Sequence, residues 1–194
     1  ETQMLRVPMP VLGANIFFDF RPLWGEPGLA DALREEIAVH AAGNPRFLKQ
    51  MSDNALTNRP PINWRGELAT AEDTSGVEGV DLKMSGSVPF VDGARILALA
   101  VGVRATNTVE RLTEAGAKKG IPPEEIRAWC DAVEFVQRLR LREQHRRAGR
   151  GTMGEGNPNV VPLAELSALD RRILKEAMRQ VRKLQQRLEL DYPG

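Results

Sequence analysis

The chain has 194 residues and a formal net charge of +1, with 42% apolar, 27% charged and only 5% aromatic residues. This composition is typical of a helix-rich globular protein and argues against an intrinsically disordered chain. The small net charge also gives no overall electrostatic field that would attract nucleic acid or an anionic membrane. No apolar run reaches the roughly 18 residues that a membrane span needs, and we expect a cytoplasmic protein.

The N-terminal segment differs from the rest of the chain. Residues 14–20 (ANIFFDF) form an apolar run that predicts a buried strand ending at Pro22. The chain begins with Glu1 rather than methionine, and a lone strand cannot bury both of its faces. We therefore interpret residues 1–24 as the remnant of an upstream domain or as a linker, and residues 25–194 as a helical domain.

Six helices are predicted in this domain, each with a recognisable start signal. Prolines at first helical positions, asparagine caps and a Ser-x-x-Asp start mark these beginnings. The third helix is apolar nearly all round, as expected of a central bundle helix. The helices begin near Pro27, Asn44, Pro89, Asn107, Pro122 and Ser167. The predicted fold class is all-α: an antiparallel, up-and-down helical bundle with an irregular N-terminal arm and one short strand.

Two stretches lack helical periodicity. Residues 57–79 are rich in proline and glycine and are predicted to form a loop, and residues 149–158 a flexible connector. After the first stretch, residues 80–84 form a short extended piece on which Asp81 and Lys83 alternate and point the same way. The two side chains either contact a nucleotide or a neighbouring domain, or form a salt bridge that orients the loop.

Two arginines stand near the starts of predicted helices. Arg95 follows Asp92 by about one helical turn and can pair with it, and the apolar helix around Arg95 directs its side chain inward or to a domain interface. Arg111 offers a planar fork suited to phosphate or carboxylate, although a core salt bridge is the commoner role. Both arginines are candidates for substrate binding.

A further group of arginines lies toward the end of the helix that begins near Pro122. The helix dipole favours cations there, which explains most of them without a ligand. Arg140 and Gln144 lie one turn apart on the same side, and we expect these two to line a pocket. Aromatic residues are sparse around them, so nucleic-acid binding is not expected.

Several of these segments occur together in one known family. VDLK (80–83), VPFVDGAR (88–95), TNTVERL (106–112), EFVQRLRLREQ (134–144) and LSALDRRILKEAMRQVRKLQ (166–185) follow one another in the order expected for it. Over residues 14–192 the chain resembles the nucleotidyltransferase substrate-binding domain at the C-terminus of bacterial signal-transduction proteins. Those proteins carry cyclic-nucleotide-binding and CBS domains upstream, then a nucleotidyltransferase domain similar to protein-PII uridylyltransferase. The resemblance implies that the upstream domain of which residues 1–24 are interpreted as a remnant, if they are not a linker, is this nucleotidyltransferase domain.

The resemblance implies a module that binds or positions a nucleotide or an acceptor for a catalytic domain. The whole protein would transfer a nucleotidyl group with Mg²⁺, whereas this chain lacks the family's Gly-Ser and paired aspartates and is not expected to catalyse alone or to hold a cofactor. Asp19 would be a third carboxylate of the metal site, completed by the upstream domain. The candidate substrate-binding residues are Asp81, Lys83, Arg95, Arg111, Arg140 and Gln144.

A second interpretation is a regulatory, interdomain or dimerisation module that binds no ligand. A pocket in which the candidate cations converge would favour substrate binding, and their pairing with nearby carboxylates would favour the second interpretation. The expected partners are the upstream nucleotidyltransferase, CBS and cyclic-nucleotide-binding domains of the same protein, a nucleotide, and a second copy of the chain.

Overall fold

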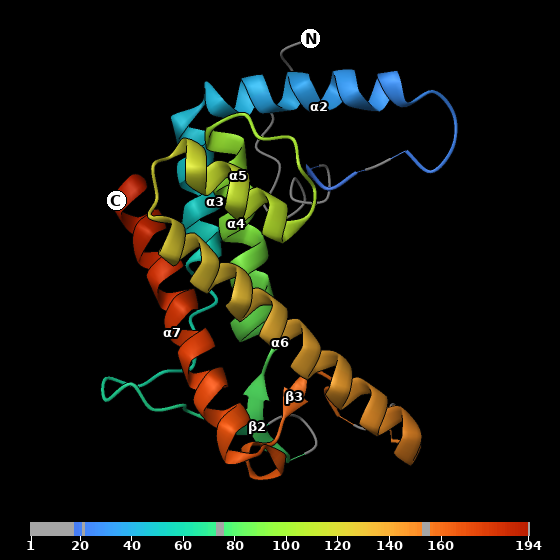
Figure 1. Ribbon diagram of the computed structural model, residues 1–194, viewed down its shortest axis with the longest axis vertical. Helices are drawn as coiled ribbons and strands as arrows, with labels where there is room; N and C mark the ends of the chain where they lie inside the picture. The colour runs from blue at the N-terminus through green and yellow to red at the C-terminus, as the bar shows by residue number, and fades with distance from the viewer. Residues whose placement is uncertain (1–17, 21, 73–75, 153–155, 194) are drawn as a thin grey trace.

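The computed structural model describes residues 18–20, 22–72, 76–152 and 156–193, and most of these are helical (Figure 1). The helices are α2 (Pro27–Ala42), α3 (Pro45–Ala55), α4 (Val88–Ala100), α5 (Thr108–Lys118), α6 (Pro123–Arg150) and α7 (Ala168–Asp191). The predicted all-α bundle is confirmed, with a small antiparallel sheet added to it. Within the described ranges, none of these helices combines the length and apolar character needed to cross a membrane.

The helices begin where the sequence signals place them. Asn44, Asn107 and Ser167 each accept hydrogen bonds from backbone amides in the first turns of α3, α5 and α7. These caps satisfy amides that have no partner inside the helix. Helices α2, α4 and α6 have a proline in the first turn, where its missing amide donor costs nothing.

Helix α4 lies at the centre of the bundle and contacts α2, α3, α5 and α7. Most of its side chains are buried, Phe90 and Leu97 among them, which confirms that it is apolar nearly all round. Gly93 allows α7 to approach closely, because a Cβ atom at this position would lie 2.7 Å from Leu184. In Figure 1, α6 and α7 run in opposite directions and diverge toward the end where β2 and β3 lie.

The sheet consists of three short strands, β1 (Ala71–Glu72), β2 (Glu78–Asp81) and β3 (Val160–Val161). They are antiparallel, in the order β1-β2-β3, with Val80 opposite Val161. The extended piece predicted from Val80 corresponds to β2. The other two strands were not predicted, because runs of two residues are too short to show a period.

The prediction that Asp81 and Lys83 alternate on one extended segment is wrong. The strand ends at Asp81, and Lys83–Ser87 forms a π-helix, η2, that leads directly into α4. The Asp81 carboxylate causes this change of direction, because its Oδ1 accepts hydrogen bonds from the backbone amides of Lys83 and Met84, both at 2.9 Å. Asp81 therefore acts on the backbone of the turn.

The predicted N-terminal strand lies largely outside the described residues, and its last three residues, 18–20, are not in a strand. Helix α2 lies across one end of the bundle (Figure 1). Only Ala38 and Ala41 are buried in it, whereas Leu29 is 77% exposed. The apolar repeat that predicts this helix therefore points largely away from the core.

Candidate functional site

The arginines of α4 and α5 converge on one carboxylate, and we call Asp19, Arg95 and Arg111 together the Asp19 site. Arg95 Nη2 donates a hydrogen bond to Asp19 Oδ2 at 2.5 Å, and Arg111 Nη1 donates to Asp19 Oδ1 at 2.7 Å. Both arginines are buried, at 5% and 4% exposure. Two of the predicted substrate-binding residues thus meet, together with the residue predicted as a metal ligand.

The remaining donors of the two guanidinium groups are mostly used nearby. Arg95 Nη1 donates to Asp92 Oδ1 at 2.6 Å, as the one-turn spacing predicted. Arg111 Nε donates to the carbonyl of Ala105 at 2.6 Å, and its Nη2 to the carbonyl of Phe18 at 2.9 Å. Arg95 Nε is buried and has no hydrogen-bond partner among the described residues. Buried polar atoms are normally paired, so this unpaired donor is an exception in the site.

The charged groups in and beside the Asp19 site shift one another's pKa values. Partial burial raises the pKa of Asp19, but the hydrogen bonds and charges of Arg95 and Arg111 outweigh burial and hold this pKa below its ordinary value. Burial raises the pKa of Asp92, against the opposing effect of Arg95. Burial lowers the pKa of Arg111, although the Asp19 charge opposes that change. Asp19 is therefore ionised at neutral pH and supplies the negative charge that both guanidinium groups share.

A pocket that is partly open to solvent lies between α2, α4 and the start of α5, and Phe18 and Phe20 line it, so that little enclosed space remains. Its charged lining residues are all arginines: Arg34, Arg95, Arg104 and Arg111. Its walls are apolar and include Ile37, Ala38, Ala98, Leu99 and Val103. Apolar walls with a few convergent polar groups are typical of small-molecule sites, and cationic groups of this kind suit an anion.

Asp19 is a poor position for a metal ion in this arrangement. Both of its carboxylate oxygens accept hydrogen bonds from guanidinium groups, which would repel a cation placed beside them. Among the residues that the structure describes, no group of three or more His, Cys, Asp or Glu side chains is arranged to hold a metal. The residues around Asp19 do not fit the Mg²⁺ site that the family resemblance implies.

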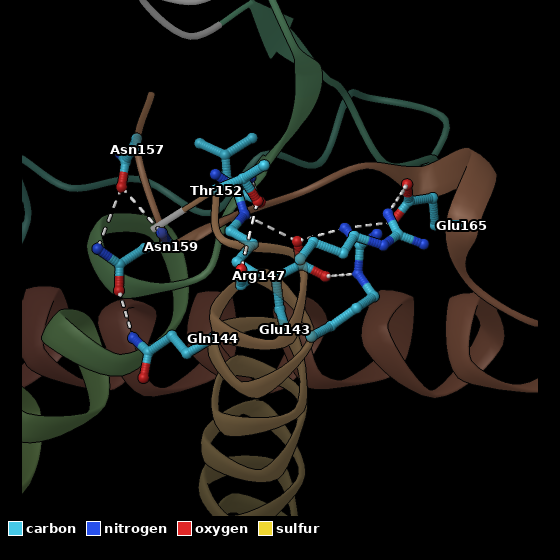
Figure 2. Close-up of polar contacts among 10 residues, drawn as sticks. Glu143, Gln144, Arg147, Thr152, Asn157, Asn159 and Glu165 are labelled. Atoms are coloured by element: carbon cyan, nitrogen blue, oxygen red, sulfur yellow. Dashed lines mark hydrogen bonds and ion pairs between the residues drawn. The ribbon is translucent and has the colours of Figure 1, made fainter. Parts of the chain in front are cut away.

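A second cluster brings together other predicted residues. Arg140 donates hydrogen bonds to Ser87 Oγ at 3.0 Å and to Asn159 Oδ1 at 2.9 Å. Gln144 donates to the same Asn159 oxygen at 3.4 Å. Figure 2 shows Gln144, Asn159 and Asn157 following one another beside the end of α6. The cluster fastens the chain before β3 to α6 and to the start of α4.

Asp81 joins this cluster through Asn157, whose Nδ2 donates to Asp81 Oδ2 at 2.7 Å. The two asparagines belong to, or directly follow, the predicted flexible connector, for which no role beyond a turn was expected. The sequence feature that could have identified them is Asn157-Pro158-Asn159, because asparagine side chains in such turns commonly form hydrogen bonds with nearby backbone groups. Asn157 and Asn159 are thus residues of the cluster that the sequence analysis missed.

The four candidate cations do not form one pocket. Arg95 and Arg111 meet at the Asp19 site, whereas Arg140 reaches Ser87, which lies about 12 Å from Arg95 along the helix axis. Lys83 is exposed, and its ammonium group has no hydrogen-bond or ion-pair partner among the described residues. Arg95 and Arg111 line the pocket between α2, α4 and α5.

A third group of ionic side chains ties the end of α6 to β3, and we call Glu143, Arg146, Arg147 and Glu165 the Glu143 network. Glu143 and Arg147 are buried, at 5% and 7% exposure, and pair at 2.9 Å. Arg146 contacts Glu143 at 2.6 Å and Glu165 at 2.5 Å. Figure 2 shows Glu143 and Arg147 between the asparagines and Glu165.

The Glu143 network also reaches the sheet, because Arg147 donates to the carbonyl of Val160 at 3.0 Å. Burial raises the pKa of Glu143, but the hydrogen bonds of Arg146 and Arg147 outweigh burial and lower it. We expected the helix dipole alone to explain these arginines. The spacing of Glu143 to Arg146 and Arg147, three and four residues, could have revealed the pairing.

Residues 45–192 match the family model described as putative nucleotidyltransferase substrate binding domain. No curated protein and no solved structure matches the chain. The matched range begins at the first residue of α3 and contains Arg95 and Arg111. Asp19 and α2 lie outside it.

Proposed function

The chain belongs to the putative nucleotidyltransferase substrate-binding domain family, and on this basis we propose that it binds an anionic group of a nucleotide or acceptor and positions it for a catalytic domain of the same protein. The pocket whose charged lining residues are all arginines carries this proposal. Holding a reacting group in a fixed place is itself a large part of catalysis in group transfer. The bond-forming step, with its Mg²⁺, belongs in this proposal to the catalytic domain.

Arg95 and Arg111 are the residues that would bind the anion. A guanidinium group presents parallel donors that match the oxygens of a phosphate or carboxylate. Both arginines are paired with carboxylates, Arg95 with Asp19 and Asp92 and Arg111 with Asp19, which favours the second interpretation of the sequence, but the Asp19 carboxylate between them also supports anion binding at this place. The apolar walls suit the uncharged part of a ligand.

Isothermal titration calorimetry with ATP and with inorganic tripolyphosphate tests the proposal. We expect both to bind the wild-type chain, and Arg111→Gln to weaken binding by about tenfold or more, since hydrogen bonds between charged groups contribute about 1.5–3 kcal/mol each. Arg142→Gln is the matched control, because Arg142 is 58% exposed and pairs with Asp170. Absence of binding at millimolar ligand, or equal weakening by both substitutions, would contradict the proposal.

A second candidate function is an interdomain or dimer contact made through α2. The side chains of Leu23 and Trp24 just before this helix are 91% and 96% exposed, and those of Leu29 and Val39 within it 77% and 66%. Exposed apolar side chains gathered on one element commonly mark an interaction surface. Sedimentation equilibrium of the wild type and of Leu29→Ser tests it: a dimer that the substitution weakens is expected, and a monomer at all concentrations would leave no support for a second copy as the partner.

A further inference from the structure

Residues Phe18 to Phe20 lie in the arginine pocket much as a bound ligand would. Arg111 holds the Phe18 carbonyl and one Asp19 oxygen, and Arg95 holds the other oxygen. Arg34 donates to the Phe20 carbonyl at 2.7 Å and lies 5.2 Å from the centre of the Phe20 ring. Three helices, α2, α4 and α5, thus each contribute an arginine that binds this short segment.

The carboxylate of the Asp19 site comes from a distant part of the chain. Asp19 is separated by 76 residues from Arg95 and by 92 residues from Arg111. It also lies outside the range that matches the family, whereas both arginines lie inside it. The family domain therefore contributes the two cations of this site, and the segment before α2 contributes its central anion.

Burial is unequal between the two sides of the Asp19 site. The side chains of Arg95 and Arg111 are 6% and 5% exposed, whereas that of Asp19 is 39% exposed. A buried cation left without an anion is strongly unfavourable. Arg95 also pairs with Asp92, but Asp19 is the anion that the two arginines share, and it lies at the solvent side, where another anion can take its place.

We infer that Asp19 is a built-in competitor: Phe18, Asp19 and Phe20 occupy the anion site of Arg95 and Arg111, and a phosphate-bearing ligand binds by displacing them. This inference rests on the proposed function. Phe18 and Phe20 line the pocket themselves, so their departure also enlarges it. Only molecules in which the segment has left the site can bind the ligand. The apparent affinity is therefore the intrinsic affinity multiplied by the fraction of such molecules.

Two substitutions separate displacement from simple electrostatics. Asp19→Asn removes both the competing anion and its negative charge, whereas Phe18→Ala retains the charge and weakens the seating of the segment, since the Phe18 ring lies 5.8 Å from that of Phe47. Both should bind inorganic tripolyphosphate more tightly than the wild type, by about tenfold for Asp19→Asn and several-fold for Phe18→Ala. Asp53→Asn is the control, because it removes an exposed carboxylate paired with Lys49.

Calorimetric titration of the four proteins with tripolyphosphate decides the matter, after circular dichroism confirms that each is folded. Tighter binding in both variants, with the control unchanged, supports displacement. Tighter binding in Asp19→Asn alone would show a charge effect only and overturn the inference. Equal binding in all four, still weakened by Arg111→Gln, would also overturn it while leaving the proposed function intact. If none of the four binds, the anion site itself is refuted and the inference with it.

Discussion

The Asp19 site and the Glu143 network both bury arginines against a carboxylate, but they are built differently. In the Glu143 network, the central carboxylate and its two arginines lie within one turn of α6, and carboxylate and Arg147 are both buried. In the Asp19 site, the carboxylate comes from a segment before α2 and is 39% exposed. The central carboxylate of one arrangement pairs with arginines of its own helix, whereas that of the other is a distant and accessible partner.

This difference separates a structural ion pair from a candidate binding site. Arg147 connects Glu143 to the Val160 carbonyl, so the Glu143 network fastens α6 to the sheet. Arg95 and Arg111 line a pocket, and the anion between them can leave toward solvent. Substitutions at the two places should therefore differ in what they affect: stability in the Glu143 network, and ligand affinity in the Asp19 site.

The largest loss of stability is expected from Glu143→Gln. Removing one partner of a buried ion pair leaves an uncompensated charge and costs about 3 kcal/mol or more, which lowers the Tm by roughly 6–12 °C in a chain of this size. Thermal unfolding followed by circular dichroism measures this change. Asp53→Asn, at the exposed pair with Lys49, should change stability by less than about 0.5 kcal/mol. A Tm for Glu143→Gln no lower than that of Asp53→Asn would remove the structural role of the network.

Asp19→Asn should have a smaller effect on stability, and one that depends on pH. Its carboxylate is 39% exposed and partly screened by solvent, but its loss leaves the buried Arg111 without a carboxylate, so we expect a loss of about 2 kcal/mol at pH 7. The pKa of Asp19 in the folded chain lies below its ordinary value of 3.8. The stabilisation is therefore complete above the unfolded pKa and is lost as the pH falls through the folded pKa.

The pH dependence of this effect has a definite sign. In urea unfolding, the wild type should exceed Asp19→Asn in stability near neutral pH, and the gap should close in acid, below about pH 4. Asp92 acts in the opposite sense, because its raised pKa makes the folded chain bind a proton more readily than the unfolded chain. Asp92 is present in both proteins, but the Asp19 charge contributes to its raised pKa, so this opposing effect is smaller in Asp19→Asn. A gap that stays constant into acid would show that the Asp19 charge does not stabilise the folded state.

The helices could be predicted from the sequence because their signals are local. Asn44, Asn107 and Ser167 cap helices within a few residues of themselves, and proline at the first turn depends on nothing distant. The sheet could not be predicted, since β3 is only two residues long and pairs with a strand, β2, that is far from it in the sequence. The turn at Asp81 was missed because its carboxylate bonds to the backbone, which the alternation of side chains does not reveal.

The site was predictable only in part, for a similar reason. The polarity of Arg95 within an apolar helix and the fork of Arg111 identified both residues, and the spacing of Asp92 predicted one ion pair. Nothing in the sequence indicated that Asp19 would lie between the two arginines, since the contact spans 76 residues or more. Long-range pairing of this kind is set by how the helices pack, and it is invisible to any local pattern.

The smallest effect is expected at Gln144, which the sequence analysis placed in a pocket with Arg140. Its hydrogen bond to Asn159 is long, at 3.4 Å, and Arg140 already donates to the same oxygen at 2.9 Å. Gln144→Ala should therefore lower stability by less than about 0.5 kcal/mol. It should also leave the affinity for tripolyphosphate within about twofold of wild type, because Gln144 belongs to the cluster at the other end of α4.

Thermal unfolding and calorimetric titration of Gln144→Ala, with Arg111→Gln measured in parallel, test this directly. If Gln144→Ala weakened tripolyphosphate binding as much as Arg111→Gln, the anion would have to reach the Arg140 cluster as well. That would require Arg140 to release Ser87 or Asn159, and both of these contacts hold the start of α4 and the chain before β3 in place. Since ligand binding there would have to break contacts of the fold, whereas at the Asp19 site it replaces one anion by another, the Asp19 site is the one suited to exchange.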